Sequence, residues 1–199
     1  MLTLAVLCLA LQPMSAQKNQ GNYKYHKAVE IIEEGGDFEE ARALLEENVS
    51  ENPQHMDSYM YLAGIYRRNE DYSAAMNILN KALKNNHKNS GISEATILWW
   101  KASVYDDIDD SENAVRLMEE ALKKGRKQNK ANLDKMLESM AQFYYSNEQY
   151  EASDALYREM LKNDDSAQLP RIGLARNMNA REEYDQALAM LDECIRFDS

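Results

Sequence analysis

Cysteine is nearly absent from this sequence: its 199 residues include only Cys8 and Cys194. Cys8 lies in an N-terminal segment that is expected to be removed, as argued below. Cys194 alone cannot form an intramolecular disulfide, so the stability of the chain must then come from packing. Glycine and proline are also scarce, with 7 and 3 residues, and residues that favour strands never cluster. A chain so poor in turn-forming residues, and rich in Glu, Lys, Ala, Leu, Met and Asn, is predicted to be all-helical.

Positive charge is also in short supply. The net charge is −11 and the pI is near 4.8, so nucleic acid would be repelled, and we expect no nucleic-acid partner. The most basic stretch is residues 123–130, KKGRKQNK. We interpret it as a solvated helix end and its connection rather than as a binding patch.

Long apolar runs are missing except at the N-terminus, where the segment from Leu2 to Leu11 is apolar. This run is too short to span a bilayer. With Pro13 and the small residues Ser15 and Ala16 after it, the run is typical of a secretory signal peptide over residues 1–16. The protein is then expected to be exported, to the periplasm, the cell envelope or the medium, with membrane contact peripheral at most. Without such a signal it would be cytoplasmic.

The rest of the chain contains an internal repeat. A small residue recurs with spacings of 34, 39, 39 and 34, at Ala41, Ala75, Ala114, Ser153 and Ala187. Around each of them, apolar residues recur at i, i+3, i+4 and i+7, which is the period of a helix. A similar segment precedes each one, so every unit is predicted to be a helix, a short turn and a second helix.

These columns resemble those of the tetratricopeptide repeat (TPR) family. Large residues near the end of the first helix stand at Ile32, Tyr66, Tyr105, Tyr144 and Met178, and small residues within it at Val29, Ala63, Ala102, Ala141 and Ala175. The resemblance implies an all-α, right-handed α-solenoid of about ten antiparallel helices. Its five units would cover residues 22–55, 56–91, 92–130, 131–166 and 167–199. Lys101, Arg171, Asn48 and Met160 depart from the family pattern, and the 39-residue spacings predict longer helices or a helical extension between units.

No constellation for catalysis or metal binding stands out. His26, His55 and His87 fall in different units without a ligand partner at metal spacing. The acidic run DDIDD (106–110) lacks the glycine and the terminal glutamate of a calcium loop, and no glycine-rich phosphate loop occurs. We therefore expect no enzyme activity, no metal, no cofactor and no small-molecule substrate.

The resemblance also implies a binding surface, because the first helix of each unit in this family lines a concave groove. The groove residues predicted in this way are His26, Glu30, Met60, Arg67, Arg68, Trp99, Ser103, Glu138, Gln142, Tyr145 and Arg176. The only two tryptophans are adjacent. Trp100 is predicted to lie in the core, whereas Trp99 is equally compatible with a binding anchor and with the core.

These features predict a non-catalytic scaffold that binds a peptide or a protein segment in the groove. The alternative is that the chain is the TPR interaction module of a longer envelope protein, with a catalytic or assembly domain beyond residue 199. Repeat arrays usually end with a helix whose outer face is polar, and the sequence to Ser199 contains none. Continuation of the chain, a covering partner and self-association through the uncapped C-terminal repeat all remain open.

Overall fold

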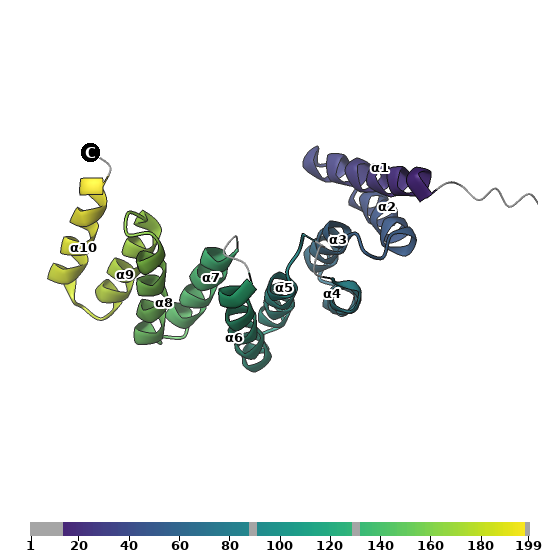
Figure 1. Cartoon of the computed structure of the whole chain (residues 1–199). Helices are drawn as coiled ribbons and strands as arrows, with labels where there is room; N and C mark the ends of the chain where they lie inside the picture. Colours follow the sequence, from purple (N-terminus) through teal and green to yellow (C-terminus); the bar gives the residue numbers. More distant parts are fainter. Residues whose placement is uncertain (1–13, 88–90, 129–131, 198–199) are drawn as a thin grey trace, which may run out of the picture. The chain divides into compact units, whose positions relative to one another are not determined.

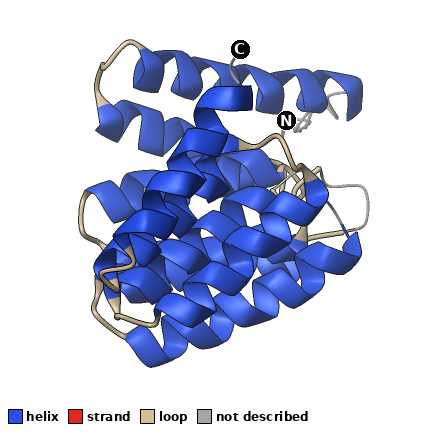
Figure 2. Cartoon of the chain, turned by 90° about the vertical axis from the view of Figure 1, so that its left-hand side faces the viewer, coloured by secondary structure: helices blue, strands red, loops and turns tan. Residues whose placement is uncertain are grey.

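The computed structural model describes residues 14–87, 91–128 and 132–197, and in these ranges it contains ten helices and no strand (Figure 2). The all-helical prediction is therefore confirmed for the described residues. The helices are α1 (Met14–Glu33), α2 (Phe38–Glu51), α3 (Met56–Arg68), α4 (Tyr72–Asn85), α5 (Glu94–Asp107), α6 (Ser111–Gln128), α7 (Leu133–Ser146), α8 (Tyr150–Asn163), α9 (Gln168–Ala180) and α10 (Tyr184–Phe197).

The helices fall into two compact units, residues 1–92 and 93–199. In the first, α1 packs on α2, α2 on α3 and α3 on α4. In the second, each helix from α5 to α10 packs on the next in the same way (Figure 1). Within each unit, every helix thus packs against its neighbours in sequence, as expected for helical hairpins.

Small residues lie where these helices come closest together. The repeated small positions in the second helix of each pair, from Ala41 to Ala187, are all buried. The same holds in the first helices for Ala63, Ala102 and Ala141. A side chain of one methyl group lets two backbones approach, while Leu, Met and Tyr fill the space on either side.

The turn within each pair has one repeated geometry. Glu70, Asp109, Glu148 and Glu182 have φ between 58 and 63°, and Gly35 has φ of 69°. After each of them, a backbone N–H donates to a carbonyl at the end of the first helix, as Gln149 does to Tyr144 (2.8 Å). This left-handed cap stops the helix and turns the chain back. The glycine cap in EEGGD (33–37) is of this kind.

Polar residues at normally apolar family positions have partners. Asn48 is fully buried, and its Nδ2 donates to Ser58 Oγ (2.6 Å). The guanidinium of buried Arg171 donates to the carbonyls of Ala167 (2.8 Å) and Asp165. Such bonds offset the cost of burying these groups, so the departures fit inside the repeat.

The predicted lengthening occurs at α6, which has 18 residues where α2, α4 and α8 have 14. The segment after α4 includes residues 88–90, which lie outside the described part. At the other end, α1 begins at Met14, ahead of the predicted repeat start at residue 22. Most of the predicted signal peptide, residues 1–13, is likewise outside the described residues. Among the described helices, none has both the length and the apolar character needed to cross a membrane.

Candidate protein-binding surface

The predicted groove residues of α1 lie on the surface. His26 is exposed, with its ring centroid 5.2 Å from that of Tyr25. Glu30 is also exposed and forms an ion pair with Lys27 (3.1 Å) one turn away. Surface ion pairs of this kind are weak, so Glu30 remains available for contact with another molecule. His26 is available because its side chain is exposed.

The predicted residues of α3 divide into two kinds. Met60 is only 8 % exposed and packs in the core of the unit. Arg67 is half-buried, and Arg68 is exposed with its guanidinium carbon 3.9 Å from the ring centroid of Phe38. Through this cation–π contact the Arg68 side chain lies over Phe38, the first residue of α2. The sequence placed Met60 and Arg68 on one face, and the structure shows that only Arg68 presents its side chain to solvent.

Both tryptophans on α5 are half-buried. Their ring centroids are 6.4 Å apart, in an edge-to-face arrangement. Nε1 of Trp99 is shielded from solvent and finds no hydrogen-bond acceptor in the described part of the chain. Ser103, one turn on, donates to the Trp99 carbonyl (3.2 Å). A buried donor without an acceptor is uncommon, which makes Trp99 the predicted groove residue with an unmet bonding requirement.

Two predicted groove residues on different helices meet in the second unit. The guanidinium carbon of Arg176 on α9 lies 4.1 Å from the ring centroid of Tyr145 on α7. The same guanidinium donates to the hydroxyl of Tyr157 on α8 (3.3 Å). Burial raises the pKa of Tyr157, so its hydroxyl stays protonated at neutral pH. Arg176 itself is exposed and keeps donors for a ligand.

The other two groove residues of α7 lie beside this cluster in sequence. Gln142 is exposed, and its Nε2 donates to Glu138 Oε1 (3.0 Å) one turn earlier. Glu138 is half-buried. The surface of α7 therefore offers an amide, a carboxylate and an aromatic ring along successive turns.

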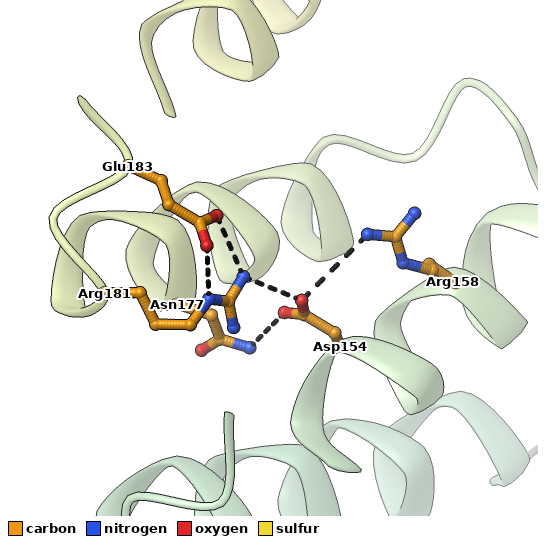
Figure 3. A network of polar contacts seen from close by, with 5 residues as sticks. All are labelled: Asp154, Arg158, Asn177, Arg181 and Glu183. Carbon is orange, nitrogen blue, oxygen red and sulfur yellow. Dashed lines mark hydrogen bonds and ion pairs between the residues drawn. The ribbon is translucent and has the colours of Figure 1, made fainter. Parts of the chain in front are cut away.

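A polar network that the sequence did not indicate connects α8 to the end of α9 (Figure 3). Asp154 is buried, and its Oδ1 accepts from Asn177 Nδ2 (2.7 Å). Its Oδ2 lies 3.0 Å from Arg181 Nη2, and Arg181 Nε is 3.0 Å from Glu183 Oε1. The only signal in the sequence is a carboxylate within the second helix of the fourth repeat, and it does not indicate which residues pair with it.

The last helix pair leaves a large apolar area open. Eight large apolar side chains of the described part are exposed, and six of these lie on α9 and α10: Leu169, Ile172, Tyr184, Leu188, Leu191 and Ile195. A cleft of about 530 Å³ runs between the two helices. Cys194 of α10 is half-buried, and its Sγ lies 3.7 Å from the Met190 carbonyl. Patches of this kind mark contact sites.

The histidines and acidic side chains of the described residues form no candidate metal site. No set of three or more His, Cys, Asp or Glu side chains there is placed to hold a metal ion. His26 and His87 are exposed, and His55 serves as a helix cap. The DDIDD run spans the end of α5 and the turn before α6, where Asp110 Oδ1 accepts from the backbone N–H of Asn113 (3.2 Å).

The repeats match a known family in the sequence comparison. A family model described as tetratricopeptide repeat matches residues 34–95, and a second model with the same description matches residues 95–123. Residues 34–123 are therefore tetratricopeptide repeats. The predicted family is thereby confirmed. No curated protein matches the sequence of this TPR protein.

Solved structures extend the likeness over most of the TPR chain. BtubC (BKLC) from P. vanneervenii has a TM-score of 0.71 at 18% identity, covering 93% of this chain and 89% of that chain. A tetratricopeptide repeat protein from Parabacteroides merdae ATCC 43184 has a TM-score of 0.68 at 20% identity, covering 89% of this chain and 66% of that chain. YrrB, described as a TPR protein with an unusual peptide-binding site, has a TM-score of 0.58 at 14% identity, covering 92% and 89%.

At such identities these likenesses show the fold alone. They confirm the predicted all-α repeat solenoid, and with the family models they show a protein of the kind that serves in protein–protein interaction. Proteins of this repeat family are generally scaffolds without catalytic activity.

Proposed function

We propose that this TPR protein is a non-catalytic scaffold that holds a peptide or an extended protein segment against the first helices of its repeats. The proposal rests mainly on the contact between Tyr145 and Arg176. Both were selected from the repeat register as groove residues, and their side chains meet although they come from different helices. Neither is needed to fill the core, because Arg176 is exposed and Tyr145 only half-buried.

The chemistry of this cluster suits a peptide. An arginine donates several hydrogen bonds to carbonyl or carboxylate oxygens, and a tyrosine ring offers a flat apolar surface. Trp99 adds an indole N–H without an acceptor in the described residues. Because that N–H is shielded from solvent, the part of Trp99 that a bound segment can touch is the exposed area of its ring. The peptide-binding site named for YrrB, a protein of similar fold, supports the same kind of ligand.

Site-specific photo-crosslinking tests the proposal. A photoreactive amino acid at Gln142, exposed on α7, should capture one discrete protein from extract of the source cells, and the same amino acid at Lys162, exposed on α8, should not. Arg176→Ala should reduce the yield at least several-fold. Because it also removes the donor to the Tyr157 hydroxyl, the yield is compared well below the melting temperature of the variant. Equal capture from both positions would mean that the first helices carry no preferred site.

A substitution at Trp99 separates its two interpretations. Trp99→Phe keeps most of the ring area and removes the N–H that has no acceptor. If Trp99 is a binding anchor, crosslinking from Gln142 should fall while the free energy of unfolding changes by less than about 1 kcal/mol. A loss of stability without loss of capture would assign Trp99 to the core.

We also propose that the protein is exported, with residues 1–16 removed as a signal peptide. The support is the short apolar run followed by small residues. The intact mass of the protein purified from its native cells should be that of a chain whose first residue is Gln17. A mass that retains the first sixteen residues would contradict export by this route.

A further inference from the structure

The last described helix pair, α9 and α10, has an open apolar face. On α10, Tyr184, Leu188, Leu191 and Ile195 are 56, 62, 39 and 69 % exposed. Ile172 of α9, also exposed, lines the cleft with Tyr184, Leu188 and Leu191. Exposed side chains from both helices therefore form one continuous surface.

The array itself provides a comparison for this surface. In α2, α6 and α8 the position of Leu191 is taken by Leu45, Met118 and Tyr157, which are 0, 5 and 2 % exposed. Each of those helices is packed against the next helix of the same unit. At the equivalent positions of α2, α6 and α8 the side chain is therefore covered, on helices that pack against a following helix. Leu191 is exposed, so its position is one at which another polypeptide surface can dock.

The spacing of the α10 stripe decides which surface fits it. From Tyr184 to Ile195 the intervals are four, three and four residues, which puts the four side chains on one narrow line, as in a coiled-coil seam. The same intervals read identically in reverse. An antiparallel copy of α10 therefore places Tyr184 opposite Ile195 and Leu188 opposite Leu191, with every apolar residue matched.

We propose that this face binds a second copy of the chain, with the two α10 helices antiparallel across a two-fold axis. Such an interface is isologous, so both copies bury the same residues and the assembly closes at two. The proposal goes beyond the scaffold function. It uses the apolar stripe of α10, which meets the Tyr145–Arg176 cluster only at Arg176, a residue that also lines the cleft.

The size of the patch sets the strength of the dimer. The stripe spans about 17 Å of helix, and two helices side by side are about 20 Å wide. This footprint is smaller than the roughly 800 Å² per partner of a standard stable interface. The dimer is accordingly a weak one whose two copies exchange.

Acidic residues border the stripe and determine its salt response. Asp185 and Asp192 are exposed and lie on the side of the stripe away from Ala187 and Cys194. In the antiparallel pair, Asp185 of each copy comes near Asp192 of the other. Because salt screens like charges at a surface, the dimer should tighten as ionic strength rises.

Sedimentation velocity on the full chain tests this arrangement. Between about 1 and 200 μM we expect a monomer–dimer equilibrium whose Kd falls when salt is raised from about 50 to 500 mM. Leu188→Glu should raise the Kd at least about tenfold, because it buries a carboxylate in the seam. The matched control is Ile108→Glu, which places the same charge at an exposed apolar residue at the end of α5 and should leave the Kd unchanged.

A second variant tests the geometry by strengthening the dimer. Asp192→Lys turns both Asp185–Asp192 contacts into opposite-charge contacts, so the Kd at low salt should fall severalfold and then rise with added salt. Gln186→Lys, on the opposite face of α10, should have little effect. Melting curves by circular dichroism verify folding of each variant. A monomer at every concentration, a dimer indifferent to Leu188→Glu, or a dimer that Asp192→Lys does not tighten would each overturn the proposal.

Discussion

Gly173 of α9 lies directly against the ring of Tyr157 in α8. A Cβ placed on Gly173 would stand 2.3 Å from Tyr157 Cζ and 2.4 Å from its Cε2. The ring cannot easily withdraw, because Tyr157 is buried and its hydroxyl accepts a hydrogen bond from Arg176. The fourth and fifth helix pairs therefore join through a large residue on one side and the absence of a side chain on the other.

Replacement of this glycine should destabilise the protein. Gly173→Ala improves helix propensity by up to about 1 kcal/mol, but the clash with the ring should cost more, for a net loss of about 1–3 kcal/mol. Urea denaturation followed by circular dichroism measures the change. In the same assay, Tyr157→Leu in the Gly173→Ala background should recover part of the loss. Strictly additive costs would show that the two residues do not share the space.

This pair also shows how far the sequence could predict the structure. The columns of small and large residues were enough to predict ten helices, their order and the turns between them, because close approach and helical period are local requirements. The match of Gly173 to Tyr157 was not predictable. Tyr157 stands where other repeats have Leu45, Leu79 or Met118, and which residue makes room for it depends on packing between two units.

The buried carboxylate of Asp154 gives a second prediction. Arg181→Met removes the cation 3.0 Å from Asp154 and leaves a charge in a shielded place, which should cost about 2–3 kcal/mol of unfolding free energy. Arg158 also approaches Asp154, but at 4.0 Å and from an exposed position. Arg158→Met should therefore change stability by less than about 0.5 kcal/mol. Equal effects of the two substitutions, in parallel urea titrations, would argue against a specific Asp154–Arg181 pair.

The candidate site was less predictable than the fold. The repeat register alone assigned Tyr145 and Arg176 to the groove side. In the structure the two side chains are in contact. Register also selected Met60, whose flexible side chain turned into the core. Side-chain direction depends on neighbours from other helices, so a column indicates which face a residue shares and leaves its exposure undetermined.

The left-handed turns give a third prediction, in the direction of greater stability. Glu148 has φ of 59°, a conformation in which a side chain is unfavourable and glycine is not. Glu148→Gly should therefore raise the unfolding free energy by about 0.5–1 kcal/mol. Ser146→Gly, two residues earlier in the helical backbone of α7, should lower it by a similar amount. If both variants lose stability in thermal melts, the positive φ of Glu148 does not limit the stability of the turn.

The cap of α3 gives a prediction about pH. The side chain of His55 accepts from the backbone N–H of Ser58 through Nδ1 (3.4 Å), and Ser58 Oγ lies 2.9 Å from the same atom. Burial lowers the pKa of His55 below its usual 6.5, and the nearby carboxylate of Asp57 opposes this shift only in part. The folded state thus favours the neutral ring, which keeps Nδ1 free to accept.

The sign of the pH dependence follows from that shift. The unfolded chain binds a proton at His55 more readily than the folded chain, so stability is complete above about pH 6.5 and falls as the pH drops below it, towards the folded pKa. Asn is a good helix cap that does not titrate in this range, so His55→Asn should keep the cap and reduce the loss of stability between about pH 7.5 and 5.5. Urea midpoints at the two pH values measure the difference. An unchanged pH dependence in His55→Asn would assign the loss to other groups.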